Sequence, residues 1–242
     1  MYSMESRVRY SEVDYRQNMT FAALLNYFQD CCTFQSEDFG IGLEFLEELH
    51  EAWVLISWQV VLLRKPRLGE KIKVNTWPYD FGGFYGYRNF TMTDEKGETV
   101  AYANSVWAFV DMISGRPMKI APEILAVYHK EPKYPMEYAN RKIKTPKEVE
   151  AAEPFAVHAS QIDTNQHVNN EKYIEIAQEY LPGGFEIGQM RAEYRKSAVL
   201  GDILYPYIHK DEAESVITVL LTDAEVKPFA IVEFSRKKSE EK

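Results

Sequence analysis

The stretch that decides the fold lies in the second half of the chain, at residues 157–173, and reads VHASQIDTNQHVNNEKY. Its first seven residues, Val157 to Asp163, match an earlier segment, Val8 to Asp14, which reads VRYSEVD. A second match follows in the same order, because Arg64 to Glu70 and Lys196 to Asp202 both end in Leu-Gly-acid. Two matches in one order, with similar elements around them, indicate a tandem duplication.

Hydrophobic periodicity predicts the same order of elements in both halves: a short strand, one helix and a run of strands joined by short turns. In the first half, we expect a strand at 7–13, a helix from Phe21 towards Gly40, and strands at 53–63, 71–77, 84–93 and 99–110. In the second half, we expect a strand at 155–162, a helix from Asn169 that stops before Pro182, and strands at 190–196, 202–209, 215–222 and 229–236. With no helices between these strands, each sheet should be antiparallel.

The segment between the halves differs in composition, since residues 122–150 are rich in proline and in basic side chains. We interpret it as a linker that crosses the surface, with its charge forming a solvated face. The predicted domains are therefore 1–121, whose helix and facing strand offer apolar side chains for a pocket, and 151–242, which carries the candidate catalytic residues.

The composition excludes several classes of protein. The net charge of −9 argues against general nucleic-acid binding. Cys31 and Cys32 are adjacent and fit neither a disulfide framework nor a zinc site, which suits a reducing cytosol. The most apolar segment, 52–63, is too short to span a bilayer, and the N-terminus lacks the apolar run of a signal peptide. We therefore expect a cytoplasmic protein that binds no nucleic acid and no membrane.

A candidate site lies at the centre of the stretch at 157–173. Asp163, Asn165 and His167 alternate, and an extended backbone would place them on one side, just before a helix N-terminus. Taken singly, such residues are more often caps, turn formers or surface side chains. The first copy keeps the acid as Asp14 but has Arg16 and Asn18 at the other two positions. A cap that the fold needs should occur in both copies, so the Asn and His of the second copy suggest chemistry there.

The chain resembles the acyl-acyl carrier protein (acyl-ACP) thioesterases, whose best-studied members are plant enzymes. The most specific match is DTNQHVNN at 163–170 with Lys172 and Tyr173, and the segments 193–195 and 59–61 support it. The resemblance implies an α+β fold, a double hotdog of two tandem domains, each a curved antiparallel sheet wrapped around one long helix. It also implies hydrolysis of fatty acyl-ACP to free fatty acid and holo-ACP in fatty acid biosynthesis, with acyl carrier protein as the partner.

The resemblance assigns the catalytic Asp, Asn and His of the family to Asp163, Asn165 and His167. The plant members carry a Glu-Cys pair shortly after the Glu-Tyr-Arg segment, and here Ser197 and Ala198 stand in its place. A thiol nucleophile is thereby excluded at this position, and Ser197 is a candidate to orient a water molecule.

We expect Asp163 to act as the general base on a water positioned by Asn165 and His167, with the backbone N–H groups of Val168 and Asn169 holding the oxyanion. Two alternatives stay open: His167 as the base with Asp163 fixing its tautomer, or direct nucleophilic attack by Asp163. The sequence contains no Gly-x-Ser-x-Gly elbow, no His-Glu-x-x-His pattern and no Gly-rich loop in a suitable context, so we expect no metal and no cofactor.

Two further sets of residues complete the expectations. Apolar side chains of the first half are candidates for an acyl pocket: Leu24, Leu25, Phe28, Trp53, Leu55 and Trp58. Basic side chains are candidates for docking the acidic carrier protein: Lys142, Lys144, Arg191, Arg195 and Lys196. A homodimer is expected because hotdog sheets often pair. The rival functions are an acyl-CoA thioesterase, a hydratase or dehydratase on the same fold, and a non-catalytic acyl-binding module.

Overall fold

The structure is a computed structural model that describes residues 1–213 and 215–237. The chain divides into two compact units. The first unit comprises Met1–Ile56 and Leu62–Tyr138, and the second comprises Ser57–Val61 with the chain from Ala139 onwards. Residues 122–138, which we expected in the linker, pack with the first unit, because Ile124 and Tyr128 join Phe109 in a hydrophobic cluster.

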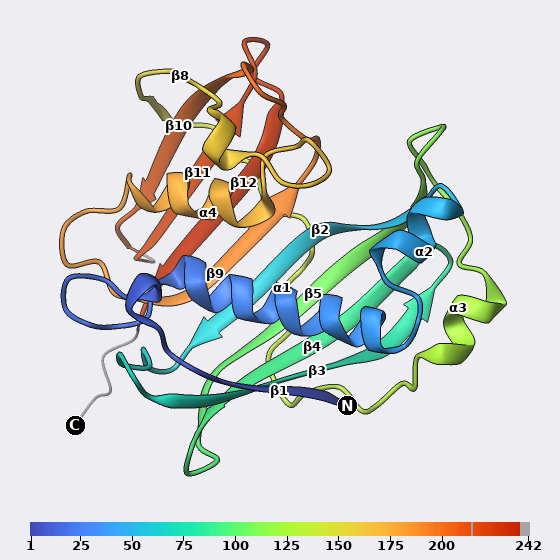
Figure 1. Ribbon diagram of the computed structural model, residues 1–242. Coiled ribbons are helices and arrows are strands. Elements are labelled where there is room, and N and C mark those ends of the chain that lie inside the picture. Colours follow the sequence, from blue (N-terminus) through green and yellow to red (C-terminus); the bar gives the residue numbers. More distant parts are fainter. Residues whose placement is uncertain (214, 238–242) are drawn as a thin grey trace. The chain divides into compact units, whose positions relative to one another are not determined.

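The first unit is an antiparallel sheet crossed by one long helix, α1 (Phe21–Asp38), as Figure 1 shows. The strand order is β1-β3-β4-β5-β2. The strands are β1 (Tyr2–Arg7), β2 (Glu51–Leu62), β3 (Lys71–Gly82), β4 (Tyr85–Asp94) and β5 (Thr99–Asp111). Shorter elements are α2 (Leu43–Glu48), β6 (Arg116–Pro117) and α3 (Pro122–Val127). The Thr20 side chain caps α1 by accepting the N–H of Ala23 at 3.1 Å, as serine and threonine commonly do.

The second unit repeats this order, as β7-β10-β11-β12-β9, with residues Ser57–Val61 of β2 paired to β9. Its strands are β7 (Glu150–Ala151), β8 (Phe155–Ala156), β9 (Ile187–Tyr194), β10 (Ile203–Asp211), β11 (Val216–Thr222) and β12 (Pro228–Arg236). Helix α4 (Asn170–Gln178) lies against β11 and β12 (Figure 1). It has 9 residues against the 18 of α1, so it is shorter than expected. The α+β fold, with one helix across an antiparallel sheet in each half, is confirmed.

The strands predicted at 7–13 and 155–162 are mostly wrong. In each copy the chain leaves the sheet and forms a short 3₁₀ turn, η1 (Tyr10–Glu12) and η2 (Ala159–Gln161). The N–H of Arg9 donates to the Glu12 side chain, and the N–H of His158 donates to the Gln161 side chain, each at 2.8 Å. These local bonds satisfy backbone groups that a strand would have paired across the sheet.

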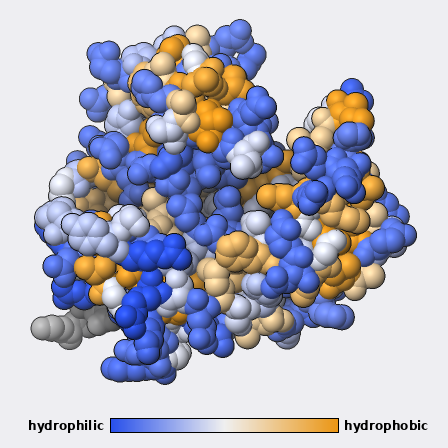
Figure 2. Space-filling model, in the orientation of Figure 1, coloured by the Kyte–Doolittle hydropathy of each residue, from blue (hydrophilic) through white to orange (hydrophobic). Residues whose placement is uncertain are grey.

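The surface carries both hydrophobic and hydrophilic side chains. Figure 2 shows hydrophobic groups reaching the surface of both units among hydrophilic ones. Among the described residues, no helix combines the length and the apolar composition needed to cross a membrane.

Candidate functional site

Residues Asp163–His167 form a closed turn in the second unit. The N–H of Asp163 donates to the carbonyl of His167 at 2.8 Å, and the N–H of Gln166 donates to the carbonyl of Asp163 at 3.1 Å. Oδ1 of Asp163 accepts the N–H groups of Asn165 at 2.8 Å and His167 at 3.3 Å. Gln166 lies in the left-handed region with φ of 61°. An extended backbone therefore does not set the directions of these side chains, and that part of the prediction was wrong.

The turn leaves its functional groups available. Within the described part of the chain, the side chains of Asn165 and His167 make no hydrogen bond, and Oδ2 of Asp163 has no partner. Asn165 is exposed, whereas Asp163 and His167 are half-buried. A carboxylate oxygen, an amide and an imidazole thus lie within five residues on a single backbone turn, and none of them is bonded to a residue that the structure describes.

The first copy contains the same turn. Oδ1 of Asp14 accepts the N–H groups of Arg16 at 2.9 Å and Asn18 at 3.0 Å, and Asp14 N–H donates to the Asn18 carbonyl at 2.8 Å. Gln17 has φ of 63°, matching its counterpart in the second copy. Oδ2 of Asp14 lies 3.7 Å from Lys65. The acid is therefore the structural cap of both turns, and only in the second copy does its outer oxygen lack a basic neighbour among the described residues.

The backbone at the start of α4 corrects one prediction. The N–H of Val168 donates to the carbonyl of Ala198 at 2.9 Å, and the N–H of Asn169 donates to the carbonyl of Gln161 at 2.9 Å. Both expected oxyanion donors are therefore already engaged in the fold. Asn169 acts as the N-cap of α4, because its side chain accepts the N–H of Glu171 at 3.1 Å. In the first turn, the N–H of Asn170 has no acceptor among the described residues.

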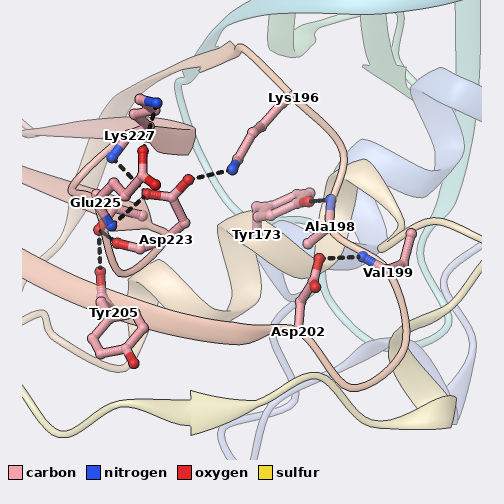
Figure 3. Close-up of polar contacts among 10 residues, drawn as sticks. Tyr173, Lys196, Ala198, Val199, Asp202, Tyr205, Asp223, Glu225 and Lys227 are labelled. Atoms are coloured by element: carbon pink, nitrogen blue, oxygen red, sulfur yellow. Dashed lines mark hydrogen bonds and ion pairs between the residues drawn. The ribbon is translucent and has the colours of Figure 1, made fainter.

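The loop at 196–202 lies against the turn through Ala198. This residue is buried, and its carbonyl accepts the N–H of Val168. Its own N–H donates to the hydroxyl of Tyr173 at 2.9 Å (Figure 3). The loop is anchored at both ends: Lys196 Nζ lies 2.5 Å from Asp223, and the Val199 N–H donates to Asp202 at 2.9 Å (Figure 3). The neighbouring Ser197 is exposed.

Two buried polar residues of α4 were not among the predicted site residues. Tyr173 is 2% exposed, and burial raises the pKa of its hydroxyl to about 12. Glu171 is 5% exposed; burial raises the pKa of its carboxyl, while nearby Lys172 opposes the shift. The signal was present in the tandem copies, because the turn and helix of the first copy align Leu24 with Tyr173 and Ala22 with Glu171.

The residues expected to form an acyl pocket are mostly buried. Leu24, Leu25, Phe28 and Leu55 are at most 2% exposed, and Trp58, which belongs to the second unit, is 4% exposed. The half-buried Trp53 packs against Phe109 with ring centroids 4.9 Å apart. These are the contacts of a close-packed core, so their use as a pocket stays a prediction.

The residues expected to dock the carrier protein divide into two groups. Arg191 pairs with Glu233 at 2.8 Å and donates to the carbonyls of Asn140 and Lys142 at 2.6 and 3.3 Å. Arg195 pairs with Glu193 at 3.0 Å, and Lys196 pairs with Asp223. Lys142 and Lys144 are exposed and form no ion pair with any described residue.

Known proteins resemble this chain over nearly its whole length. The family model for the acyl-ACP thioesterase N-terminal domain matches residues 1–128, and the model for the C-terminal domain matches residues 144–232. A chloroplastic palmitoyl-acyl carrier protein thioesterase of Gossypium hirsutum is 26% identical over 84% of this chain and 54% of its own length. The chain spans about half the length of the curated relatives it matches first.

Solved structures have the same fold. An acyl-ACP thioesterase from Bacteroides thetaiotaomicron superposes with a TM-score of 0.88 at 24% identity, covering 97% of each chain. The 12:0-ACP thioesterase from Umbellularia californica superposes with a TM-score of 0.82 at 19% identity, covering 98% of this chain and 97% of its own. At these identities the likeness establishes the fold, and the expected double hotdog is confirmed.

Proposed function

We propose that this chain, which belongs to the acyl-ACP thioesterase family, hydrolyses the thioester of fatty acyl-ACP to free fatty acid and holo-ACP. The observation that carries the proposal is the turn at Asp163–His167, where an amide, an imidazole and one carboxylate oxygen make no hydrogen bond to any described residue. Release of the fatty acid would end chain elongation in fatty acid biosynthesis. The two buried, free cysteines suit the reducing cytoplasm as its compartment.

In the proposed mechanism, Oδ2 of Asp163 takes a proton from water while Oδ1 stays bonded to the turn. The water oxygen attacks the thioester carbonyl carbon, and the C–S bond then breaks with the electron pair leaving on sulfur. A thiol has a pKa of about 8.5, so the thiolate needs little help to depart and takes up a proton afterwards. Asn165 and His167 hold the water, and Ser197 helps to orient it.

The oxyanion needs a donor other than the two that were first expected. Since Val168 and Asn169 are already bonded, we assign this role to the N–H of Asn170 at the first turn of α4, where the helix also favours negative charge. A donor of this kind contributes about 3 kcal/mol to the transition state.

The test is hydrolysis of matched acyl-ACP and acyl-CoA substrates over a range of chain lengths, measured as free fatty acid and as released thiol. The proposal predicts turnover with release of both products and a preference for acyl-ACP. A preference for acyl-CoA would make the chain an acyl-CoA thioesterase. Modification of the acyl chain without thiol release would indicate a hydratase, and tight binding without turnover would indicate an acyl-binding module.

Isotope labelling tests how the carbonyl carbon is attacked. In a single turnover with excess enzyme in oxygen-18 water, the proposed route puts the label directly into the fatty acid. Direct attack by the Asp163 carboxylate would form a mixed anhydride with loss of the thiolate. Water that opens the anhydride at the Asp163 carbon would label the Asp163 carboxylate and leave an unlabelled oxygen in the fatty acid, so labelled enzyme with unlabelled product would establish that route.

Carrier-protein docking is proposed for Lys142 and Lys144, because their charges are not neutralised by described residues. Reversing both charges (K142E/K144E) should raise KM for acyl-ACP and leave KM for a short acyl-pantetheine unchanged. The matched control is K71E/K73E, which reverses two exposed lysines of β3 in the first unit. Equal effects of both variants would contradict a specific docking surface.

The proposal also includes a homodimer. Sedimentation equilibrium of the purified chain measures this directly, and a monomer at micromolar concentration would contradict it.

A further inference from the structure

We infer that Tyr173 is a positioning residue, whose buried hydroxyl holds the loop at 196–202 against the Asp163–His167 turn. The inference rests on the proposed function and extends it, because Tyr173 would act on the reaction through Ala198 and the turn without touching the substrate. All the groups concerned belong to the second unit.

The two contacts meet at a single residue, Ala198. Ala198 is held from both sides. Its N–H donates to the Tyr173 hydroxyl at 2.9 Å (Figure 3), and its carbonyl accepts the Val168 N–H at 2.9 Å. Val168 directly follows His167, and Ser197 directly precedes Ala198. Holding Ala198 therefore limits how far the backbone that carries His167 and the backbone that carries Ser197 can move apart.

The first copy is an internal control for what the fold itself needs. There the N–H of Met19 donates to the carbonyl of Pro66 at 2.8 Å, which is the counterpart of the bond from Val168 to Ala198. Pro66 has no N–H, and the residue aligned with Tyr173 is Leu24, which has no hydroxyl. The carbonyl side of the contact is thus shared by both copies, and the N–H side is present in the second copy alone.

The added pair is costly to bury, which argues for a use beyond packing. Burying a hydroxyl costs desolvation free energy, and the hydrogen bond that it forms in the protein offsets this cost with only a small net gain in stability. Leucine would fill the same place without burying a polar group. Tyr173 is 2% exposed and Ala198 is fully buried, so water does not replace the bond when it breaks. The hydroxyl also keeps its proton at working pH, because burial raises its pKa.

The ring of Tyr173 has a separate structural contact, which allows the two roles to be divided. Its centroid lies 5.9 Å from the ring of Tyr194. Phenylalanine would keep this packing and remove only the hydroxyl. The Ala198 N–H would then lose its acceptor, and the loop would shift relative to the turn.

The experiment compares kcat and KM for acyl-ACP in wild type, Y173F and Y173L/A198P. The double variant installs the Leu/Pro pair that already folds in the first copy. We expect kcat to fall by about 10- to 100-fold in both variants, with KM within about threefold, because misplacement near 1 Å is enough for such a loss. Y27F is the matched control, since it removes a buried tyrosine hydroxyl from α1 and should leave kcat unchanged.

The outcomes separate this inference from the proposed function. A wild-type protein without acyl-ACP hydrolysis overturns the proposed function. If the wild type is active, and both Y173F and Y173L/A198P fold and have the wild-type kcat, the inference alone is overturned. Thermal melting monitors the fold, and if both variants unfold, the pair is a structural requirement and the positioning role is also overturned.

Discussion

The turn at Asp14–Asn18 and the turn at Asp163–His167 have the same hydrogen bonds and different side chains. In each, an aspartate Oδ1 accepts two backbone N–H groups and a glutamine adopts a positive φ. Beyond these shared parts, the first turn has an arginine and an asparagine where the second has an asparagine and a histidine.

The likeness extends to the loops that support the two turns. Gly69 and Gly201 have φ of 80° and 86°, which explains why Leu-Gly-acid recurs, since glycine adopts such angles without strain. Asp94 in the β4–β5 turn bonds Arg64, as Asp223 in the β11–β12 turn bonds Lys196. The comparison teaches that the turn and its supporting loop are built alike in both halves, so the side chains found in only one half are the candidates for chemistry.

The largest effect is expected on kcat, when the aspartate charge is removed separately from each of the two turns. Asn can still accept the two backbone N–H groups, so D163N should keep the turn while removing the base. We expect kcat to fall by about 10²- to 10⁴-fold in D163N. The matched variant D14N should leave kcat unchanged, and an equal loss in both would mean that the acid acts only through the fold.

A smaller effect is expected on stability, and it should be alike in the two turns. D14A and D163A each remove the acceptor of two backbone N–H groups, so each should lower the free energy of unfolding by about 1–2 kcal/mol. Urea unfolding measures both values. A loss confined to one variant would show that the turns are not equivalent.

The smallest effect is expected on the pH dependence of stability, which the ion-paired carboxylates of Asp94 and Asp223 contribute to at low pH. The Lys196 ammonium, together with the backbone N–H groups of Lys227 and Glu225, lowers the pKa of Asp223. Burial pushes the pKa of Asp94 up, but Arg64 and two backbone N–H groups lower it in sum. A depressed folded pKa contributes stability above the unfolded value, near 4, and that stability is lost as the pH falls further.

The corresponding variants are R64A and K196A. Each should destabilise the protein slightly at pH 7, and the difference from wild type should shrink towards pH 2. A difference that persists undiminished at pH 2 would contradict these ion pairs.

Much of the fold was predictable, because strong hydrophobic periodicity marks α1 and the long strands β2 to β5 and β9 to β12. The short elements were not. The 3₁₀ turns η1 and η2 depend on single side-chain bonds from Glu12 and Gln161, which leave no periodic pattern. The linker prediction did not foresee that residues 122–138 group with the first unit, where Ile124 and Tyr128 are buried in a hydrophobic cluster.

The residues of the candidate site were proposed from the sequence, whereas the geometry of the turn that holds them was not predictable. The tandem comparison singled out Asn165 and His167, but glutamine is an unusual residue at positive φ, so the turn at Gln166 was invisible in the sequence. The engaged N–H groups of Val168 and Asn169 depend on Ala198 and Gln161, and the first of these lies thirty residues away, which local pattern cannot show.

The central claim is that only the second copy carries the chemistry, on a scaffold that both copies share. The most direct test is acyl-ACP hydrolysis by N165R/H167N, which gives the second turn the side chains of the first, with R16A/N18A as the matched variant. We predict that N165R/H167N folds and melts close to wild type yet releases no measurable fatty acid, while R16A/N18A retains wild-type turnover. Fatty acid release by N165R/H167N at the wild-type rate would contradict the account.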